Sequence, residues 1–486
     1  MFRKTNKNWN SSELRSSTFM SYNSANTPLF ACNTYEFSFD FNKKREHKIK
    51  RLNKNELLDV IIIGGGASGI AAANYLQQNG KKVIILEARN RIGGRIHDEN
   101  IKGFGKLPLG AAWLHYKQDA WKNYDIKTHM LKELLDKCDV KYIKSDGLKN
   151  KENLPIYDSD GNLFINKEAM NILSKLPKLI CDECKKNPEM ILSDCIKKIL
   201  KKYKLQEDII NAFINRTTEH CSLNADLMRC KNYDCWEPNG DIVVDGYGKL
   251  IKKLANNIKI KLNSEVTKIV QNDIVIVTTK HNNIYKIYKS KYLILTIPLG
   301  VLKKGIIDFS PPLPKEKIDI LKKNIYTGLH EKIFLSFPYK FWDSKIHVFH
   351  YADNKHRGLC TQWQNLSFKK DKNILYTNLS GPDEKYVYKS DEELKDISMK
   401  HLKKIFGNNI PEPLDIYITR WKIDPFTMGS AHSQPNLNGT MNDFKIIGKP
   451  FHKIFFAGVS TSESVTETVE AAILTGIRAS KEILCL

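Results

Sequence analysis

The sequence has 486 residues, more than one hydrophobic core usually organises, which predicts two cooperating domains able to enclose a large cofactor. Its 41% hydrophobic and 27% charged residues exclude a disordered or fibrous protein. Lys and Arg number 77 against 54 Asp and Glu, a formal net charge of +23, but the lysines are spread along the chain and no basic helix with interleaved aromatics stands out. We therefore expect no nucleic-acid partner despite the basic charge.

Cysteine usage and hydropathy bear on the cellular compartment. Ten cysteines at irregular intervals, without a signal peptide, favour a reducing intracellular compartment, the cytoplasm by default. Cys181 and Cys184 form the only C-x-x-C pair, and without a second pair we expect two helix-surface thiols rather than a zinc site. No apolar run approaches the length of about 18 residues that a membrane-spanning helix needs.

Residues 1–56 are rich in Ser, Asn, Lys and Arg and show neither helical nor strand periodicity. We expect a disordered extension. Its start is poor in acids, with Arg3 and Arg15 among Ser and Thr, so an organelle transit peptide is the alternative.

A β-α-β unit follows this extension. Leu57–Ile63 is a short apolar run ending in glycines, as in a buried parallel strand. Ala67–Gln78 carries apolar residues at helical spacing, Gly80 ends that helix, and Lys82–Glu87 supplies the second strand. The order predicts a dinucleotide-binding domain.

A G-x-G-x-x-G motif, Gly64, Gly66 and Gly69, lies between that strand and that helix, where glycines allow a tight turn and close approach to a pyrophosphate. The helix start, Ala67 and Ser68, then faces the phosphates. Glu87 ends the second strand, eighteen residues beyond Gly69, where a carboxylate accepts hydrogen bonds from the adenosine ribose.

The next residues, Glu87–Arg95, resemble the second signature of the flavin-containing amine oxidase superfamily, which separates FAD from NAD. The resemblance implies that the paired glycines and Arg95 lie against the diphosphate and ribityl chain. The FAD contacts implied here are Ala88, Arg89, Gly93, Gly94 and Arg95.

The resemblance continues over nearly all of residues 57–486. The segment Leu109–His115 looks like the loop beside the flavin, in the variant of polyamine and spermine oxidases that carries a histidine at His115. Val266 matches the residue that holds the adenine through its backbone, and Gly458 with the helix from about Thr468 resembles the last FAD motif. The further contacts implied are Leu109, Gly110, Ala111, Ala112, Trp113 and Val469. Val459 departs from the glutamate usual after that glycine, which puts one cofactor contact in doubt.

The same resemblance assigns three positions at or near the reacting part of the flavin. Lys332 falls where polyamine oxidases and histone demethylases carry a lysine hydrogen-bonded through water to flavin N5, and Trp421 resembles the aromatic that flanks the flavin. Ala431 stands where monoamine oxidases attach flavin through a cysteine, so we expect noncovalent FAD.

The expected substrate contacts depart from the family pattern. The positions that sandwich the substrate between aromatics hold His220, after Glu219, and His330. With His115, three histidines could line one cavity, although a single histidine is more often a structural residue.

The resemblance implies an α/β fold with a discontinuous FAD-binding domain, 57–115, 241–300 and 446–486, and a substrate-binding domain, 116–240 and 301–445. It implies oxidation of an amine, a polyamine in the nearest relatives, by hydride transfer to flavin N5, with imine hydrolysis and reduction of O2 to H2O2. We expect a monomer or homodimer without a transmembrane segment.

Three alternatives stay open. A histone demethylase would carry helical additions that do not fit this chain. An L-amino-acid oxidase would need an arginine facing the substrate, for which Arg216 or Arg357 is available. A flavin-binding protein without catalysis is suggested by Val459 and the two substituted histidines, whereas Lys332 and His115 favour an enzyme.

Overall fold

The computed structural model describes residues 57–115, 130–144, 155–164, 167–233, 240–244, 246–353, 358–366, 372–381, 384–430, 433–462 and 468–486. The expectations for residues 1–56, Arg357 and Ala431 lie outside the described residues. Among the helices of the described residues, none combines the length and apolar character needed to span a membrane.

A mostly parallel sheet contains both strands of the predicted β-α-β unit. Its order is β13-β10-β11-β12-β1-β2-β9, with β21 also paired to β12. Strands β1, β2, β9, β12 and β21 run parallel, and α1 forms the β-α-β crossover from β1 to β2. The strands are β1 (Leu58–Ile63), β2 (Val83–Leu86), β9 (Ile260–Lys261), β10 (Glu265–Gln271), β11 (Val275–His281), β12 (Ile284–Leu295), β13 (Asp308–Ser310) and β21 (Ile454–Phe456).

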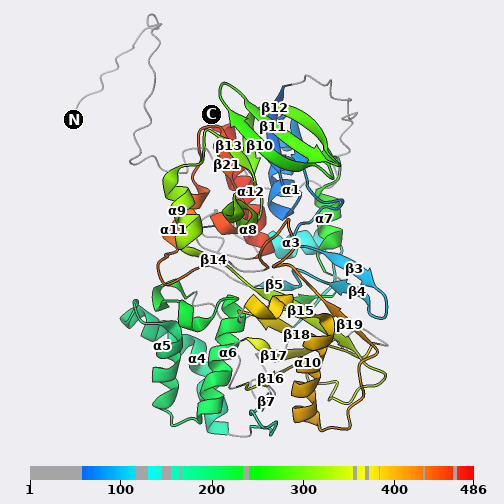
Figure 1. The fold of residues 1–486 in the computed structure, drawn as a ribbon, viewed down its shortest axis with the longest axis vertical. Helices are drawn as coiled ribbons and strands as arrows, with labels where there is room; N and C mark the ends of the chain where they lie inside the picture. Colours follow the sequence, from blue (N-terminus) through cyan, green and yellow to red (C-terminus); the bar gives the residue numbers. More distant parts are fainter. Residues whose placement is uncertain are drawn as a thin grey trace, which may run out of the picture. The chain divides into compact units, whose positions relative to one another are not determined.

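Two helices far apart in sequence pack together beside this sheet, α1 (Ala67–Gln78) and α12 (Val469–Leu484) (Figure 1). The close approach depends on Gly476, where an added Cβ would lie 2.2 Å from Ser68 O. The predicted bounds of the first helix agree with α1, and the predicted strands with β1 and β2 to within one residue. The sheet draws on each of the three segments expected for the FAD-binding domain, and β13 extends it beyond residue 300.

A second, mostly antiparallel sheet has the order β19-β15-β18-β17-β16-β7. One face packs against α10 (Asp391–Phe406). This helix begins with a capping box formed by Ser390 and Glu393. The strands are β7 (Ile156–Tyr157), β15 (His330–Ser336), β16 (Val348–Tyr351), β17 (Leu359–Asn365), β18 (Ile374–Ser380) and β19 (Asp415–Ile418).

A helical cluster, α4 (Lys167–Lys186), α5 (Leu192–Lys201) and α6 (Glu207–Cys221), shares one apolar core. The expectation of helix-surface thiols at Cys181 and Cys184 is wrong, because both are buried. Since α4 is amphipathic and packs its apolar face on α5, Cys184 belongs to the shared core.

Short elements connect these layers. The small sheets are β5-β8-β6, β3-β4 and β14-β20. Their strands are β3 (Asp98–Ile101), β4 (Gly105–Pro108), β5 (Trp113–His115), β6 (Tyr142–Lys144), β8 (Gly240–Val243), β14 (Ile325–Thr327) and β20 (Ser433–Pro435). The remaining helices are α3 (Met130–Lys137), α7 (Gly248–Leu254), α8 (Leu299–Lys304), α9 (Lys315–Lys323), α11 (Asn442–Gly448) and the 3-10 turns η2 (Ala225–Leu227), η3 (Cys230–Asn232), η4 (Glu384–Tyr388) and η5 (Val459–Thr461).

Candidate active site

Two positions of the first glycine motif, Gly64 and Gly69, tolerate only glycine. Gly64 has φ +107°, and an added Cβ there would lie 2.5 Å from Thr296 Oγ1. A Cβ on Gly69 would lie 2.0 Å from Gly64 O, so Gly69 lets the first turn of α1 pack against the loop before it. These two glycines set the backbone path of the turn.

The second motif holds the first in place. The buried Glu87 carboxylate accepts hydrogen bonds from the Gly65 amide at 2.6 Å and the Arg89 amide at 2.9 Å. The Gly93 amide donates to Gly65 O at 2.8 Å. A carboxylate has about four acceptor positions, so Glu87 retains capacity for a ligand hydroxyl.

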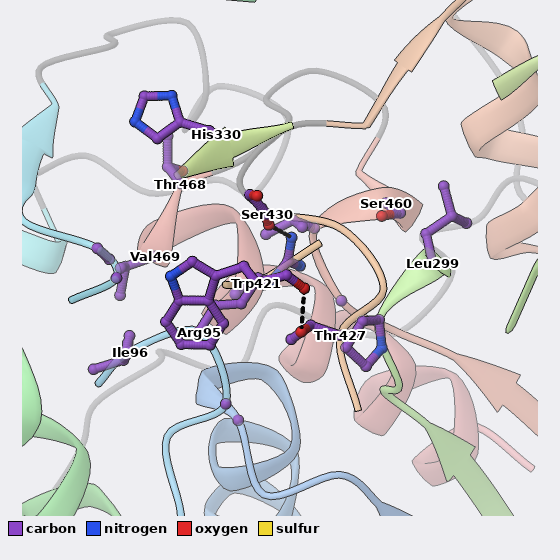
Figure 2. Close-up of a pocket in the computed structure, with 18 of the residues that line it drawn as sticks. Arg95, Ile96, Leu299, His330, Trp421, Thr427, Ser430, Ser460, Thr468 and Val469 are labelled. Carbon is purple, nitrogen blue, oxygen red and sulfur yellow. Dashed lines mark hydrogen bonds between the residues drawn. The ribbon is translucent and has the colours of Figure 1, made fainter. Parts of the chain in front are cut away.

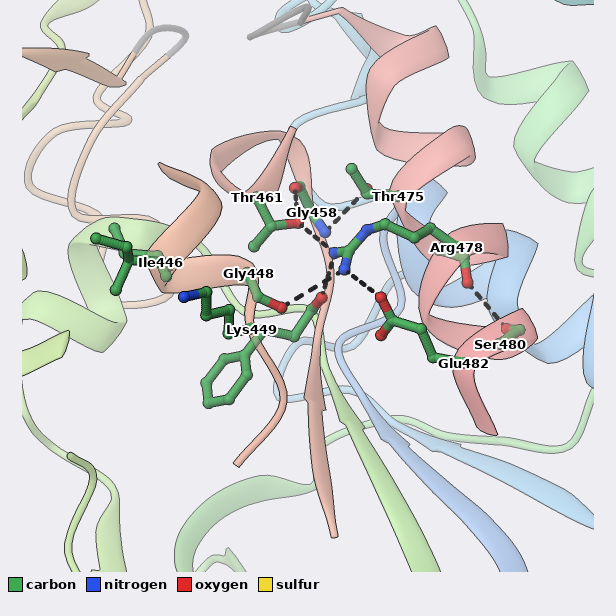
Figure 3. Close-up of polar contacts among 12 residues, drawn as sticks. Ile446, Gly448, Lys449, Gly458, Thr461, Thr475, Arg478, Ser480 and Glu482 are labelled. Atoms are coloured by element: carbon green, nitrogen blue, oxygen red, sulfur yellow. Dashed lines mark hydrogen bonds and ion pairs between the residues drawn. The ribbon is translucent and has the colours of Figure 1, made fainter. Parts of the chain in front are cut away.

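A third segment joins this site from the C-terminal end of the chain. Thr468 caps α12, its side chain accepting a hydrogen bond from the Ala471 amide at 3.0 Å. Figure 3 shows how Arg478 ties α12 to the loop after β21: its Nη2 donates to Phe456 O at 2.7 Å and Thr461 Oγ1 at 3.1 Å, and its Nη1 pairs with Glu482 at 2.8 Å. Arg478 therefore positions the Gly458 loop.

One cavity of about 550 Å³ joins these motifs to the six-stranded sheet. It brings together most of the residues singled out from sequence. Those in its lining are Gly64, Gly66, Ala67, Ser68, Glu87, Ala88, Arg89, Gly93, Gly94, Arg95, Leu109, Gly110, Ala111, Ala112, Trp113, His115, Val266, His330, Lys332, Trp421, Gly458, Val459, Thr468 and Val469. Gly69 is not in the lining and acts in packing. The backbones of Glu219 and His220 belong to α6, but their side chains, and that of Arg216, lie outside the described residues.

The cavity is shaped to accept a group against the glycine turn. Gly66 has φ −80°, which any residue can adopt, yet a Cβ there would have no protein atom nearer than Gly93 O at 3.9 Å. Neither backbone strain nor packing in the protein explains a glycine at this position, whereas room for a ligand does. The Gly66 cap of α1 has no side-chain hydrogen bond, so the amides of this helix N-terminus are available to an anion such as a pyrophosphate.

Lys332 on β15 is buried where the two halves of the cavity meet. Its Nζ donates to Gly110 O at 2.7 Å and Pro108 O at 2.9 Å, which fixes the loop before β5. Burial lowers the pKa of Lys332 to about 7, with the Asp98 carboxylate acting in the opposite direction. Near neutral pH this amine can therefore either hold or release a proton.

The neighbouring carboxylate, Glu331, organises the segment that carries Trp421. Its oxygens accept hydrogen bonds from the amides of Trp421 at 2.8 Å and Lys422 at 2.7 Å, and from the hydroxyls of Thr419 at 2.7 Å and Ser430 at 3.1 Å. Burial raises the pKa of Glu331, and these four donors oppose that shift.

Further bonds hold Trp421 and Arg95 at the cavity wall. Trp421 Nε1 donates to Leu109 O at 3.1 Å. Figure 2 shows Thr427 Oγ1 donating to Trp421 O at 2.8 Å, and Arg95 Nη1 donates to Ser430 O at 2.8 Å. The aromatic ring is therefore positioned by bonds at both its backbone and its indole nitrogen.

Sequence reasoning missed a polar wall formed by one face of the six-stranded sheet. Because side chains alternate along strands, residues two apart share a face. Strand pairing aligns the same-face residues of β15 to β18. The pairs are Lys332↔Asn378, Gln364↔Tyr376 and His350↔Gln362. The wall residues lining the cavity are His330, Lys332, His350, Gln362, Gln364, Tyr376 and Asn378. The polar-apolar alternation of Gln362-Trp363-Gln364 indicates a strand with one polar face. Only the pairing of the strands shows that this face lines the cavity.

The charged groups in the lining are unevenly distributed. Among described lining residues, the carboxylates are Glu87 and Glu265, both at the ends of strands in the parallel sheet. The arginines among them are Arg89, which forms a bidentate pair with Asp424 at 2.6 and 2.9 Å, and Arg95. The polar wall is thus made of amides, imidazoles, a phenol and one lysine.

Comparisons with known proteins agree with this geometry. Residues 67–484 match the family model described as flavin containing amine oxidoreductase. Polyamine oxidase 4 of Oryza sativa subsp. japonica is 30% identical over 449 residues, 87% of this chain and 88% of that protein. Lysine-specific histone demethylase 2 of Homo sapiens is 28% identical over 455 residues, 87% of this chain but 53% of the demethylase.

A solved structure, wild-type putrescine oxidase bound to putrescine, has the same fold. It aligns with a TM-score of 0.71 and 20% identity over 89% of this chain and all of that one. The predicted fold class, flavin cofactor and enzyme class are confirmed. The chain belongs to the flavin containing amine oxidoreductase family and is a flavin amine oxidase whose cofactor is FAD.

Proposed function

We propose that this enzyme oxidises a polyamine at the end of the cavity that the six-stranded sheet lines. The observation that carries the proposal is the continuity of one cavity from the glycine turn, past Lys332, to the polar wall. A cofactor held at the turn and a substrate held at the wall would then meet beside Lys332. The polyamine oxidases among the relatives favour this substrate class.

The FAD contacts that we propose follow from the described lining. The α1 N-terminus at Gly66–Ser68 and the Gly93–Arg95 turn would hold the diphosphate, Glu87 the ribose, and Val266 the adenine. Residues 57–115, 241–300 and 446–486 would form the FAD-binding domain. Bound FAD would accept a hydride equivalent from the carbon beside the amine nitrogen, and O2 would then take the electrons.

Lys332 would serve the reacting centre rather than hold the cofactor. The Lys332 Nζ uses two N–H groups to donate to the carbonyls of Pro108 and Gly110. Its remaining tetrahedral position holds a third N–H in the ammonium form and a lone pair in the neutral amine. With a pKa of about 7, it can hold a water or move a proton at the edge of the cavity.

The polar wall would orient the substrate while leaving its reacting amine uncharged. Gln362 and Asn378 offer amide groups, and Trp421 and Tyr376 offer aromatic faces to an alkyl chain. A carboxylate beside the reacting nitrogen would favour its protonated form, whereas neutral groups allow the free amine that oxidation requires. The described lining thus suits a neutral amine on an extended chain.

A turnover comparison tests the proposal. The purified protein is assayed for H2O2 with spermine, spermidine, putrescine, L-leucine and a methyl-lysine peptide. We expect turnover of at least one polyamine with kcat/KM well above that for leucine and the peptide. Preference for the peptide would favour a demethylase, and preference for leucine an L-amino-acid oxidase; either result would overturn the polyamine assignment.

We also propose that FAD is bound noncovalently, because Ala431 offers no thiol where monoamine oxidases attach flavin. Acid precipitation should then release the flavin into the supernatant. Flavin absorbance retained in the washed pellet would contradict this.

A further inference from the structure

Three buried cysteines meet within the helical cluster. Cys184 lies near the end of α4, Cys195 in α5, and Cys230 begins η3. Each is at most 4% exposed, and their sulfur atoms all lie within 4.8 Å of one another. The Cys184 and Cys195 sulfurs are 3.9 Å apart. None of the three lines the cavity described above.

A single buried cysteine often serves as a small apolar residue. Here, however, three separate elements each contribute one thiol to the same point, so their sulfur atoms contact one another. The Cys184 and Cys195 thiols lie within hydrogen-bonding distance of each other, and the Cys230 sulfur lies within 4.8 Å of both. Apolar packing does not require three thiols at one point, whereas a thiolate metal site does.

The spacing fits a metal ion bound by sulfur. A Zn–S bond of about 2.3 Å in a tetrahedral site places ligand sulfurs about 3.8 Å apart. The Cys184–Cys195 separation of 3.9 Å is close to that value, and the 4.8 Å limit on the others requires only small shifts. Thiolates select soft ions such as Zn²⁺ and Cu⁺.

We propose that Cys184, Cys195 and Cys230 bind one thiophilic metal ion, with Zn²⁺ as the reference occupant. Glu183 lies beside Cys184 in sequence. Its Oε1 accepts hydrogen bonds from Lys198 at 2.6 Å and Asn187 at 2.9 Å. Among the described residues, the three sulfurs are the ligand atoms that cluster within 4.8 Å, so a water or other small ligand would complete a tetrahedral site.

The site would fix one wall of the cavity. Ile180 lies one helical turn before Cys184 on α4, and Met228 lies two residues before Cys230; both line the cavity. The Cys230 amide also donates to Met190 O at 2.9 Å, which joins η3 to the α4–α5 connection. A metal ion would clamp these segments together and is therefore structural.

The test uses the full chain, purified with reductant, stripped by a chelator and reloaded with Zn²⁺. We expect about one zinc per chain, retained after desalting, and a higher melting temperature than that of the stripped protein. Cys195→Ser and Cys230→Ser should lower the zinc content at least about 10-fold, because each removes one of three ligands. The matched control is Cys138→Ser, since Cys138 is equally buried but outside the cluster.

A second measurement does not depend on the variants folding. Titrating the stripped wild-type protein with Cd²⁺ should give a thiolate-to-metal ultraviolet band that saturates at one equivalent. Failure to bind either ion, zinc content unchanged by Cys195→Ser, or a disulfide between two of the three cysteines in the reduced protein would overturn the proposal. Flavin content, measured in the same samples, keeps this outcome separate from that of the proposed amine oxidation.

Discussion

The two halves of the cavity are built in different ways. The half proposed to hold FAD, called the cofactor half, is made mainly of backbone: the Gly64–Gly69 turn, the Gly93–Gly94 turn and two helix N-termini. The half proposed to hold the amine, called the substrate half, is made of side chains on four paired strands, β15 to β18. Backbone sites depend on residues close in sequence, whereas a sheet face depends on which strands pair and in which register. The first can therefore be found from a motif and the second cannot.

Lys332 lies where the two halves of the cavity meet, and its replacement has the largest expected effect on turnover. Lys332→Met keeps the apolar stem but removes the donors, so turnover should fall about 10- to 1000-fold, the range typical of losing one positioned polar group. FAD content should be retained. Stopped-flow measurement of reduction by spermine and reoxidation by O2 identifies the affected step. Unchanged rates in both half-reactions would show that Lys332 is structural only.

Lys317 provides a matched control for this variant. Its Nζ also donates to backbone carbonyls, those of Ile446, Ile447 and Lys449, and burial likewise lowers its pKa to about 7. It does not line the cavity. Lys317→Met should therefore lower stability without changing the flavin half-reactions of the folded protein.

Replacing Gly66 tests the cofactor half alone. A Val side chain there would enter the open space beside α1, so Gly66→Val should weaken FAD binding about 10- to 100-fold, or about 1.4–2.8 kcal/mol. The melting temperature of the FAD-free protein should change little, because no protein atom is displaced. Gly69→Val, by contrast, should lower it, because the Cβ meets Gly64 O. Equal effects of both variants on the FAD-free protein would contradict the distinction between ligand space and packing.

Replacing Gln362 tests the substrate half alone. This side chain is half-buried in the polar wall, so Gln362→Leu should raise KM for the polyamine about 2- to 13-fold, as expected for one neutral hydrogen bond. The FAD content and the kcat should stay within about twofold, because the interaction is formed equally in the ground and transition states. Steady-state kinetics in air check this. A fall in FAD content would place Gln362 in the cofactor half instead.

The last expected effect concerns the pH dependence of stability rather than turnover or binding. The folded pKa of Lys332, about 7, lies below the ordinary lysine value of 10.5, so the unfolded chain binds more protons between these values. Stability due to Lys332 should therefore rise as pH increases from 7 to 10.5. Urea unfolding should show wild type gaining relative to Lys332→Met over this range. A constant difference would show that the lysine stays charged.

Sequence alone predicted the β-α-β unit and its glycine turn because glycines at fixed spacing have local steric causes. Glu87 was assigned to the ribose, but its bonds to the Gly65 and Arg89 amides depend on a folded turn and were not foreseen. The role of Glu331 was missed as well, since its four donors come from residues 419 to 430.

The cysteines show the same limit of prediction from sequence. Cys181 and Cys184 form a visible sequence pair, but the structure groups Cys184 with Cys195 and Cys230 instead. Spacing along a chain indicates which thiols are near one another only within a single element. Contacts between elements require the packing of α4, α5 and η3.

The most direct measurement is the visible spectrum of the purified protein before and after addition of spermine without oxygen. If cofactor and substrate meet beside Lys332, the oxidised flavin bands are present at first, bleach with spermine, and return when air is admitted. Flavin bands that persist with spermine and with every other polyamine would contradict polyamine oxidation by this enzyme.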